Sequence, residues 1–108
     1  MVHKTLYRVT FAYLDAVYEV YARKVSESDM FGFLVIEDFV FGENSSLVVD
    51  PSEERLKLEF NSVKRTYIPL QSVFRIDEVS KQGVSKVRDK SPDVNKISLF
   101  PVPGKPKV

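Results

Sequence analysis

The fold is decided by the stretch at residues 6–25, which reads LYRVTFAYLDAVYEVYARKV. It contains two runs in which aromatic and β-branched side chains tend to alternate with others, residues 6–14 and 17–25, separated by the short break Asp15-Ala16. A period of two places successive side chains on opposite faces of a strand, as a half-buried strand requires. The two runs therefore predict an antiparallel hairpin.

Further strands are predicted on both sides of a helix. Residues 31–41 form the most apolar stretch and are expected to be the central strand, with Phe33, Val35, Glu37 and Phe39 on one side. Shorter strands are expected at residues 47–49, 63–68 and 72–79, the last two joined by a tight connection at Pro69-Leu70-Gln71.

A helix is predicted at residues 51–60, because Asp50-Pro51-Ser52-Glu53 is a typical helix start. Asp50 is the expected N-cap, Pro51 takes the first position, where its missing N–H costs nothing, and Glu53 completes the spacing of a capping box. Leu56 and Phe60 share one face, while Glu53 and Lys57 are expected to pair on the solvent side. Such a short helix needs packing on the sheet.

These elements predict a mainly β fold with one short helix. Five or six short strands favour a small curled antiparallel barrel or half-barrel, similar in size to SH3 and Sm domains, over a sandwich, which needs more strands. We expect this domain at residues 1–79, followed by a flexible C-terminal arm at residues 80–108.

Charge separates the two parts of the chain. Residues 1–79 hold nine Lys and Arg against thirteen Asp and Glu, whereas residues 80–108 hold seven against two. The second part also contains four of the six prolines and is expected to be a flexible basic tail. A basic arm on an acidic body favours either an anionic partner or a merely solubilising role.

Composition leaves little for enzymatic chemistry. The chain has no cysteine, which excludes disulfides and thiolate metal sites, and its one histidine, His3, lies at the terminus. The carboxylate pairs Glu37-Asp38 and Asp77-Glu78 are strand neighbours that point to opposite faces, and the glycines form no phosphate-binding motif. We expect a cytoplasmic protein that is not an enzyme, with no cofactor, no metal and no membrane segment.

A nucleic-acid contact is the first functional hypothesis. Basic and aromatic side chains interleave at Lys64, Arg65 and Tyr67, with Arg75 on the next strand, as on surfaces that pair cations with phosphates and stack bases on rings. The arm would add contacts from four further cations, Lys81, Lys86, Arg88 and Lys90. The pattern favours RNA or a ribonucleoprotein as partner, although a strand with a solvated basic face would show it too.

A protein-interaction adaptor is the second hypothesis. Residues 97–103 read ISLFPVP, an apolar, proline-rich segment suited to docking in a groove, with Leu99, Phe100 and Pro101 as the contact residues. An exposed sheet edge that pairs with a partner strand is the other form of this hypothesis. The sequence is compatible with a monomer and with a homodimer joined at such an edge.

Several stretches resemble a known family. They are residues 17–23, 32–33, 39–43, 48–57, 60, 63–69, 75–79 and 100–101, which together extend over most of the chain. The family comprises short uncharacterised proteins of Pseudomonas-like and related proteobacteria. The resemblance implies a bacterial cytoplasmic protein and adds no mechanism, since no site residues are established for the family.

Overall fold

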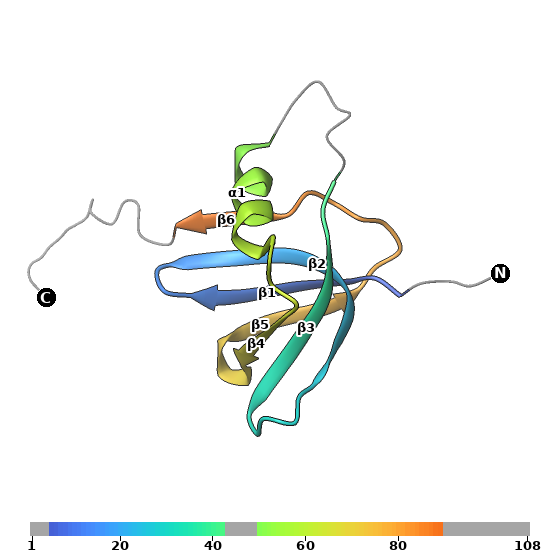
Figure 1. The fold of residues 1–108 in the computed structure, drawn as a ribbon, viewed down its shortest axis with the longest axis vertical. Coiled ribbons are helices and arrows are strands. Elements are labelled where there is room, and N and C mark those ends of the chain that lie inside the picture. The colour runs from blue at the N-terminus through green and yellow to red at the C-terminus, as the bar shows by residue number, and fades with distance from the viewer. Residues whose placement is uncertain (1–4, 43–49, 90–108) are drawn as a thin grey trace, which may run out of the picture.

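Six antiparallel strands, one α-helix and one 3-10 turn make up the computed structural model, which describes residues 5–42 and 50–89 (Figure 1). The mainly β prediction is confirmed. In chain order the elements are β1 (Tyr7–Tyr13), β2 (Ala16–Glu27), β3 (Phe33–Val40), α1 (Pro51–Phe60), β4 (Arg65–Pro69), η1 (Leu70–Ser72), β5 (Val73–Glu78) and β6 (Lys86–Asp89). The short strand expected at residues 47–49 lies outside the described residues.

The long strand β2 organises the sheet. The strand order is β4-β3-β2-β1-β5, and β6 pairs with β2 as well. Residues 16–22 of β2 pair with β1, while the opposite edge is shared by β6 along residues 16–19 and by β3 along residues 21–27. The central strand is therefore β2, and the expectation that residues 31–41 would be central is wrong. The predicted hairpin is confirmed, with Leu14-Asp15 as its two-residue turn.

The sheet curls into a half-barrel. Strands β4 and β5 stand at opposite ends of the strand order, yet only the three residues of η1 separate them along the chain. A link of three residues spans roughly 10 Å, so the two outer strands must approach each other where they are joined. They do not pair, and the barrel stays open on this side (Figure 1).

The core occupies the concave side of the sheet. Val9, Val20 and Ile36 are fully buried there together with Leu56 of α1. The alternation predicted for residues 31–41 fails at Asp38, which has a left-handed backbone with φ 57°. Ile36 and Phe39, three residues apart, both pack in or against the core, because this one irregular residue breaks the period of two.

Helix α1 begins as the sequence predicts. The Asp50 carboxylate accepts hydrogen bonds from the amides of Ser52 at 2.9 Å and Glu53 at 3.1 Å, which satisfies two donors of the first turn. Leu56 packs in the core and Phe60 packs against it, so the predicted apolar face is confirmed.

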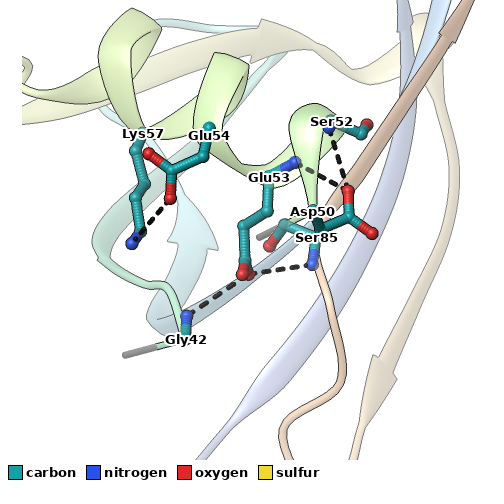
Figure 2. Close-up of polar contacts among 7 residues, drawn as sticks. All are labelled: Gly42, Asp50, Ser52, Glu53, Glu54, Lys57 and Ser85. Carbon is teal, nitrogen blue, oxygen red and sulfur yellow. Dashed lines mark hydrogen bonds and ion pairs between the residues drawn. The ribbon is translucent and has the colours of Figure 1, made fainter. Parts of the chain in front are cut away.

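Glu53 does not complete a capping box, and it does not pair with Lys57 on the solvent side. Its side chain is buried and accepts hydrogen bonds from the backbone amides of Gly42 at 3.3 Å and Ser85 at 3.1 Å (Figure 2). Lys57 instead contacts Glu54 at 3.3 Å. The buried carboxylate thus joins the helix start to the end of β3 and to the approach to β6, a role that spacing along a helix does not reveal.

Residues 86–89, which we expected within the flexible tail, form strand β6. Val87 is buried opposite Tyr18 of β2, while Lys86, Arg88 and Asp89 are exposed. On the other edge of β6, the Ser52 hydroxyl accepts from the Val87 amide at 2.6 Å and donates to its carbonyl at 3.2 Å. Residues of β2 and α1 hold this segment in place. The sequence of residues 86–89 is polar except for Val87, so it does not indicate these partners.

We predict that Glu53→Ala lowers the free energy of unfolding by roughly 2–4 kcal/mol, since it leaves two backbone donors without their acceptor. Glu54→Ala is the matched control: it also removes a carboxylate from the first turn of α1, but among the described residues the Glu54 side chain has only its contact with Lys57, so the loss should be about 0.5 kcal/mol or less. Urea unfolding followed by circular dichroism measures both. Equal losses would contradict a structural role for the buried carboxylate.

Candidate functional site

The proposed basic and aromatic cluster on β4 is exposed but partly neutralised. Lys64 and Arg65 are exposed, and the side chain of Tyr67 is 39% exposed. The Arg65 guanidinium lies 3.4 Å from the carboxylate of Glu37 on β3. Arg65 therefore has a protein partner that a phosphate would have to displace.

Arg75 is far from this cluster in the strand order and belongs to another surface. Arg75 of β5 is paired in register with Thr10 of β1, Thr10 with Glu19 of β2, and Glu19 with Lys86 of β6. Residues paired across antiparallel strands have side chains on the same face of the sheet. Four strands thus carry one row of side chains on the convex side of the sheet.

We call this surface the outer face and define it by Arg8, Thr10, Glu19, Arg75, Lys86 and Arg88. Arg88 joins it because it is paired with Val17, two residues from Glu19 on β2. A small hollow on this face is lined by Thr10, Val17, Glu19, Lys86 and Arg88. Three of the eight residues expected to contact nucleic acid, Arg75, Lys86 and Arg88, therefore meet on the outer face.

Asp77 neutralises two cations of the outer face. Its carboxylate lies 2.8 Å from the Arg8 guanidinium and 3.0 Å from that of Arg75. The hydrogen bond from Arg8 holds the pKa of Asp77 below its usual range, and the contact with Arg75 adds to this effect. Among the described residues, Lys86 and Arg88 have no carboxylate within ion-pair distance, so they are the freest cations of this face.

Of the remaining candidate residues, only Lys81 lies within the described residues. Lys81 is exposed in the segment that leads to β6, where the backbone at Gly83 passes the Tyr21 hydroxyl so closely that an added Cβ would lie 2.5 Å from it. Lys90 and the docking residues Leu99, Phe100 and Pro101 lie outside the described residues, as does His3. No part of the structure bears on their roles.

One carboxylate of each pair singled out in the sequence takes part in ion pairs. Glu37 contacts Arg65 and lies 4.0 Å from Lys24, and Asp77 contacts Arg8 and Arg75. Across residues 5–42 and 50–89, no three His, Asp or Glu side chains are arranged to hold a metal ion. In the same residues no helix is long and apolar enough to cross a membrane.

An aromatic pocket that the sequence did not reveal lies where the half-barrel is open. It has a volume of about 450 Å³ and is enclosed by the end of β1, by β4 and by the last turn of α1. The aromatic pocket is lined by Phe11, Ala12, Tyr13, Leu14, Tyr18, Glu59, Phe60, Thr66, Tyr67, Ile68, Pro69 and Ser72. Spacing cannot reveal it, because its walls come from separate elements brought together by the curl of the sheet.

Two polar groups are placed within this apolar wall. The Tyr18 hydroxyl donates to the Glu59 carboxylate, with its oxygens at 3.1 and 3.2 Å, and the Tyr18 ring stacks on Phe11 at 5.0 Å between centroids. Burial raises the pKa of Tyr18 to about 12, and the charge of Glu59 and the hydrogen bond to it contribute further. The aromatic pocket therefore offers rings for apolar contact and one carboxylate for a donor.

Leu14 at the rim combines exposure with an unusual backbone. It is 79% exposed and has φ 56° in the hairpin turn, a region that favours glycine over residues with a Cβ. Strained positions of this kind gather at binding surfaces, where the rest of the fold holds them in place. Tyr13, beside it, is 53% exposed, so this corner presents two large apolar side chains to an incoming group.

Comparison with known proteins gives one match. The model of a protein family described as a domain of unknown function (DUF1820) matches residues 5–102, which include the outer face and the aromatic pocket. No curated protein and no solved structure matches the chain.

The raised pKa of Tyr18 predicts a separate step in a spectrophotometric tyrosine titration. The folded state keeps the Tyr18 proton up to a pH of about 12, whereas an unfolded tyrosine loses it near 10. The stability that Tyr18 contributes is therefore fully present below pH 10 and is lost as the pH rises from about 10 to about 12. Tyr18→Phe should remove the late step. Glu59→Gln should move it toward lower pH, since it removes the negative charge near the hydroxyl.

This titration is read only at pH values where circular dichroism shows folded protein. Ionisation of Tyr18 near pH 10 in the folded chain would contradict the arrangement of Tyr18 and Glu59.

Proposed function

Because the chain belongs to the family described as a domain of unknown function (DUF1820), which names no activity, we propose a function from the geometry: a non-enzymatic cytoplasmic module that binds RNA or a ribonucleoprotein. Its contact surface is the outer face, with Lys86 and Arg88 as the principal phosphate ligands. The arm that follows β6 supplies further cations.

The observation that carries this proposal is the register of the sheet. Arg75, Lys86 and Arg88 are separated along the chain, and pairing through β1 and β2 brings them to one surface. Lys86 and Arg88 stand two residues apart on β6, so their side chains point the same way. Adjacent cations on one face suit the repeated charges of a nucleic-acid backbone.

Local charges decide which cations do most of the binding. Arg8 and Arg75 are engaged by Asp77, and Glu19 lies in the same row and repels a phosphate. Lys86 and Arg88 have no such pairing in residues 5–42 and 50–89, and they lie at the edge of the face, next to the start of the arm. Binding through them makes affinity strongly dependent on salt.

We predict that Lys86→Gln with Arg88→Gln weakens binding of the full chain to a fluorescent mixed-sequence single-stranded RNA. If each cation neutralises one phosphate, the slope of log affinity against log salt should become shallower by about 1.4. Lys64→Gln with Arg65→Gln is the matched control, because it removes the same number of charges at the start of β4. Fluorescence anisotropy across a salt series measures all three proteins.

A larger loss in the control pair would move the contact surface to β4. No binding by the parent chain at low salt would overturn the nucleic-acid proposal itself.

A second candidate function rests on the open edge of β5. Among the described strands, β5 pairs only with β1, which leaves its other edge free. Phe74 is 59% exposed, and Ile76 is 41% exposed although it is paired with the fully buried Val9. A free edge that carries apolar side chains favours pairing with a partner strand, so we propose an adaptor function in which a second copy of the chain is the simplest partner.

For this second function we predict concentration-dependent dimerisation in sedimentation equilibrium. Phe74→Lys should weaken it by about tenfold or more, which corresponds to about 1.4 kcal/mol. Phe31→Lys is the control, since Phe31 is fully exposed in the turn between β2 and β3 and lies outside β5. A chain that stays monomeric at high concentration would rule out pairing between two copies.

A further inference from the structure

The aromatic pocket has the chemistry of a groove for an extended proline-rich segment. Tyr13, Tyr18 and Phe60 present rings from three different elements, and Pro69 extends the wall at the end of β4. Grooves that bind such segments are lined with aromatic side chains, because a proline ring packs well on a flat aromatic surface and enters already ordered. The carboxylate of Glu59 offers an acceptor at one wall.

The chain itself contains a segment of this kind. Residues 97–103 read ISLFPVP, with Leu99, Phe100 and Pro101 at the centre and a second proline two residues later. The segment is uncharged, whereas lysines stand on both sides of it at positions 96 and 105. An apolar core between cations is complementary to an apolar groove that carries a carboxylate.

The end of β6 lies close to the aromatic pocket. Asp89, the last residue of β6, is paired with Ala16, and Ala16 is paired with Tyr13, whose side chain lines the pocket. From Asp89 to Leu99 there are ten residues, which span at most about 36 Å when extended and roughly 16–19 Å on average as a flexible chain. Both lengths allow Leu99 to reach the pocket.

We propose that Leu99, Phe100 and Pro101 dock in the aromatic pocket of the same chain. A short tether gives the segment an effective concentration on the order of millimolar at the pocket, so even weak contacts keep it bound in the same chain. The exposed Leu14 and Tyr13 supply the rim against which it packs. While docked, the segment is not available to a partner's groove, so a partner that takes it must compete with the pocket.

This inference is independent of the proposed RNA contact. The outer face lies on the convex side of the sheet, and the aromatic pocket lies at the open side of the half-barrel. The test below uses no RNA, so a failure of one proposal leaves the other standing.

Paramagnetic relaxation in the full chain tests the docking. Because the chain has no cysteine, Val102→Cys gives a single site for a nitroxide label. We expect the amides of Tyr13, Thr66 and Tyr67 to lose most of their NMR peak intensity, while that of Val79, which is hydrogen-bonded to Leu6 at the opposite end of β1 from Tyr13, keeps its intensity. Retained intensity at the pocket amides would overturn the proposal.

Two variants show whether the contact is specific. Phe100→Ala should restore the pocket signals, because it removes the largest side chain of the docking segment. Leu14→Gly should weaken the broadening without loss of stability, since glycine adopts φ 56° freely while the rim side chain is lost. Broadening that persists in Phe100→Ala, or that disappears in high salt, would show a general attraction of the basic arm to the body and would overturn docking.

A mixed sample distinguishes the same chain from a second copy. Isotope-labelled chain without nitroxide is combined with spin-labelled chain that carries no isotope, at low concentration. Docking within one chain predicts no broadening in this sample. Broadening as strong as in the sample whose chain carries both the isotope and the nitroxide would assign the segment to the pocket of another copy. That result would overturn the intramolecular proposal.

Discussion

The buried carboxylate of Glu53 is the interaction on which the arrangement of both candidate surfaces depends. It accepts from the amides of Gly42 and Ser85, and so joins α1 to the end of β3 and to the approach to β6 (Figure 2). A polar group with little access to water is tolerated in a protein only with such hydrogen bonds. Because the start of α1 is held in this way, Ser52 reaches the edge of β6 at one end of the helix, and Glu59 and Phe60 reach the aromatic pocket at the other.

Incomplete closure of the sheet leaves an apolar hollow near exposed aromatic side chains. The three residues of η1 bring the outer strands together at one point, but no hydrogen-bonded ladder joins them. The ring of Tyr13, which would be covered in a closed barrel, remains accessible, and among the described strands the other edge of β5 remains free. The same opening therefore explains the pocket and the edge on which the adaptor function rests.

Charge is distributed so that most cations of the body are matched locally. Arg8 and Arg75 share Asp77, and Arg65 contacts Glu37, which removes much of their attraction for an anionic partner. Lys86 and Arg88 differ because β6 carries them at the edge of the sheet, away from these carboxylates. A basic residue in the sequence is therefore a weak indication of nucleic-acid binding. The fold shows whether a neighbouring carboxylate already neutralises it.

Local chemistry was sufficient to predict the hairpin of β1 and β2, the helix at residues 51–60 with its Asp50 cap, and the mainly β class, because alternation and capping act between residues close in the chain. The sequence alone determined these elements. Only the tertiary structure decided that Glu53 is buried, that residues 86–89 form a strand, that Arg75 meets Lys86 and Arg88, and that an aromatic pocket exists. Each of these depends on groups supplied by distant parts of the chain, and the curl and register of the sheet, which bring them together, are properties of the whole fold.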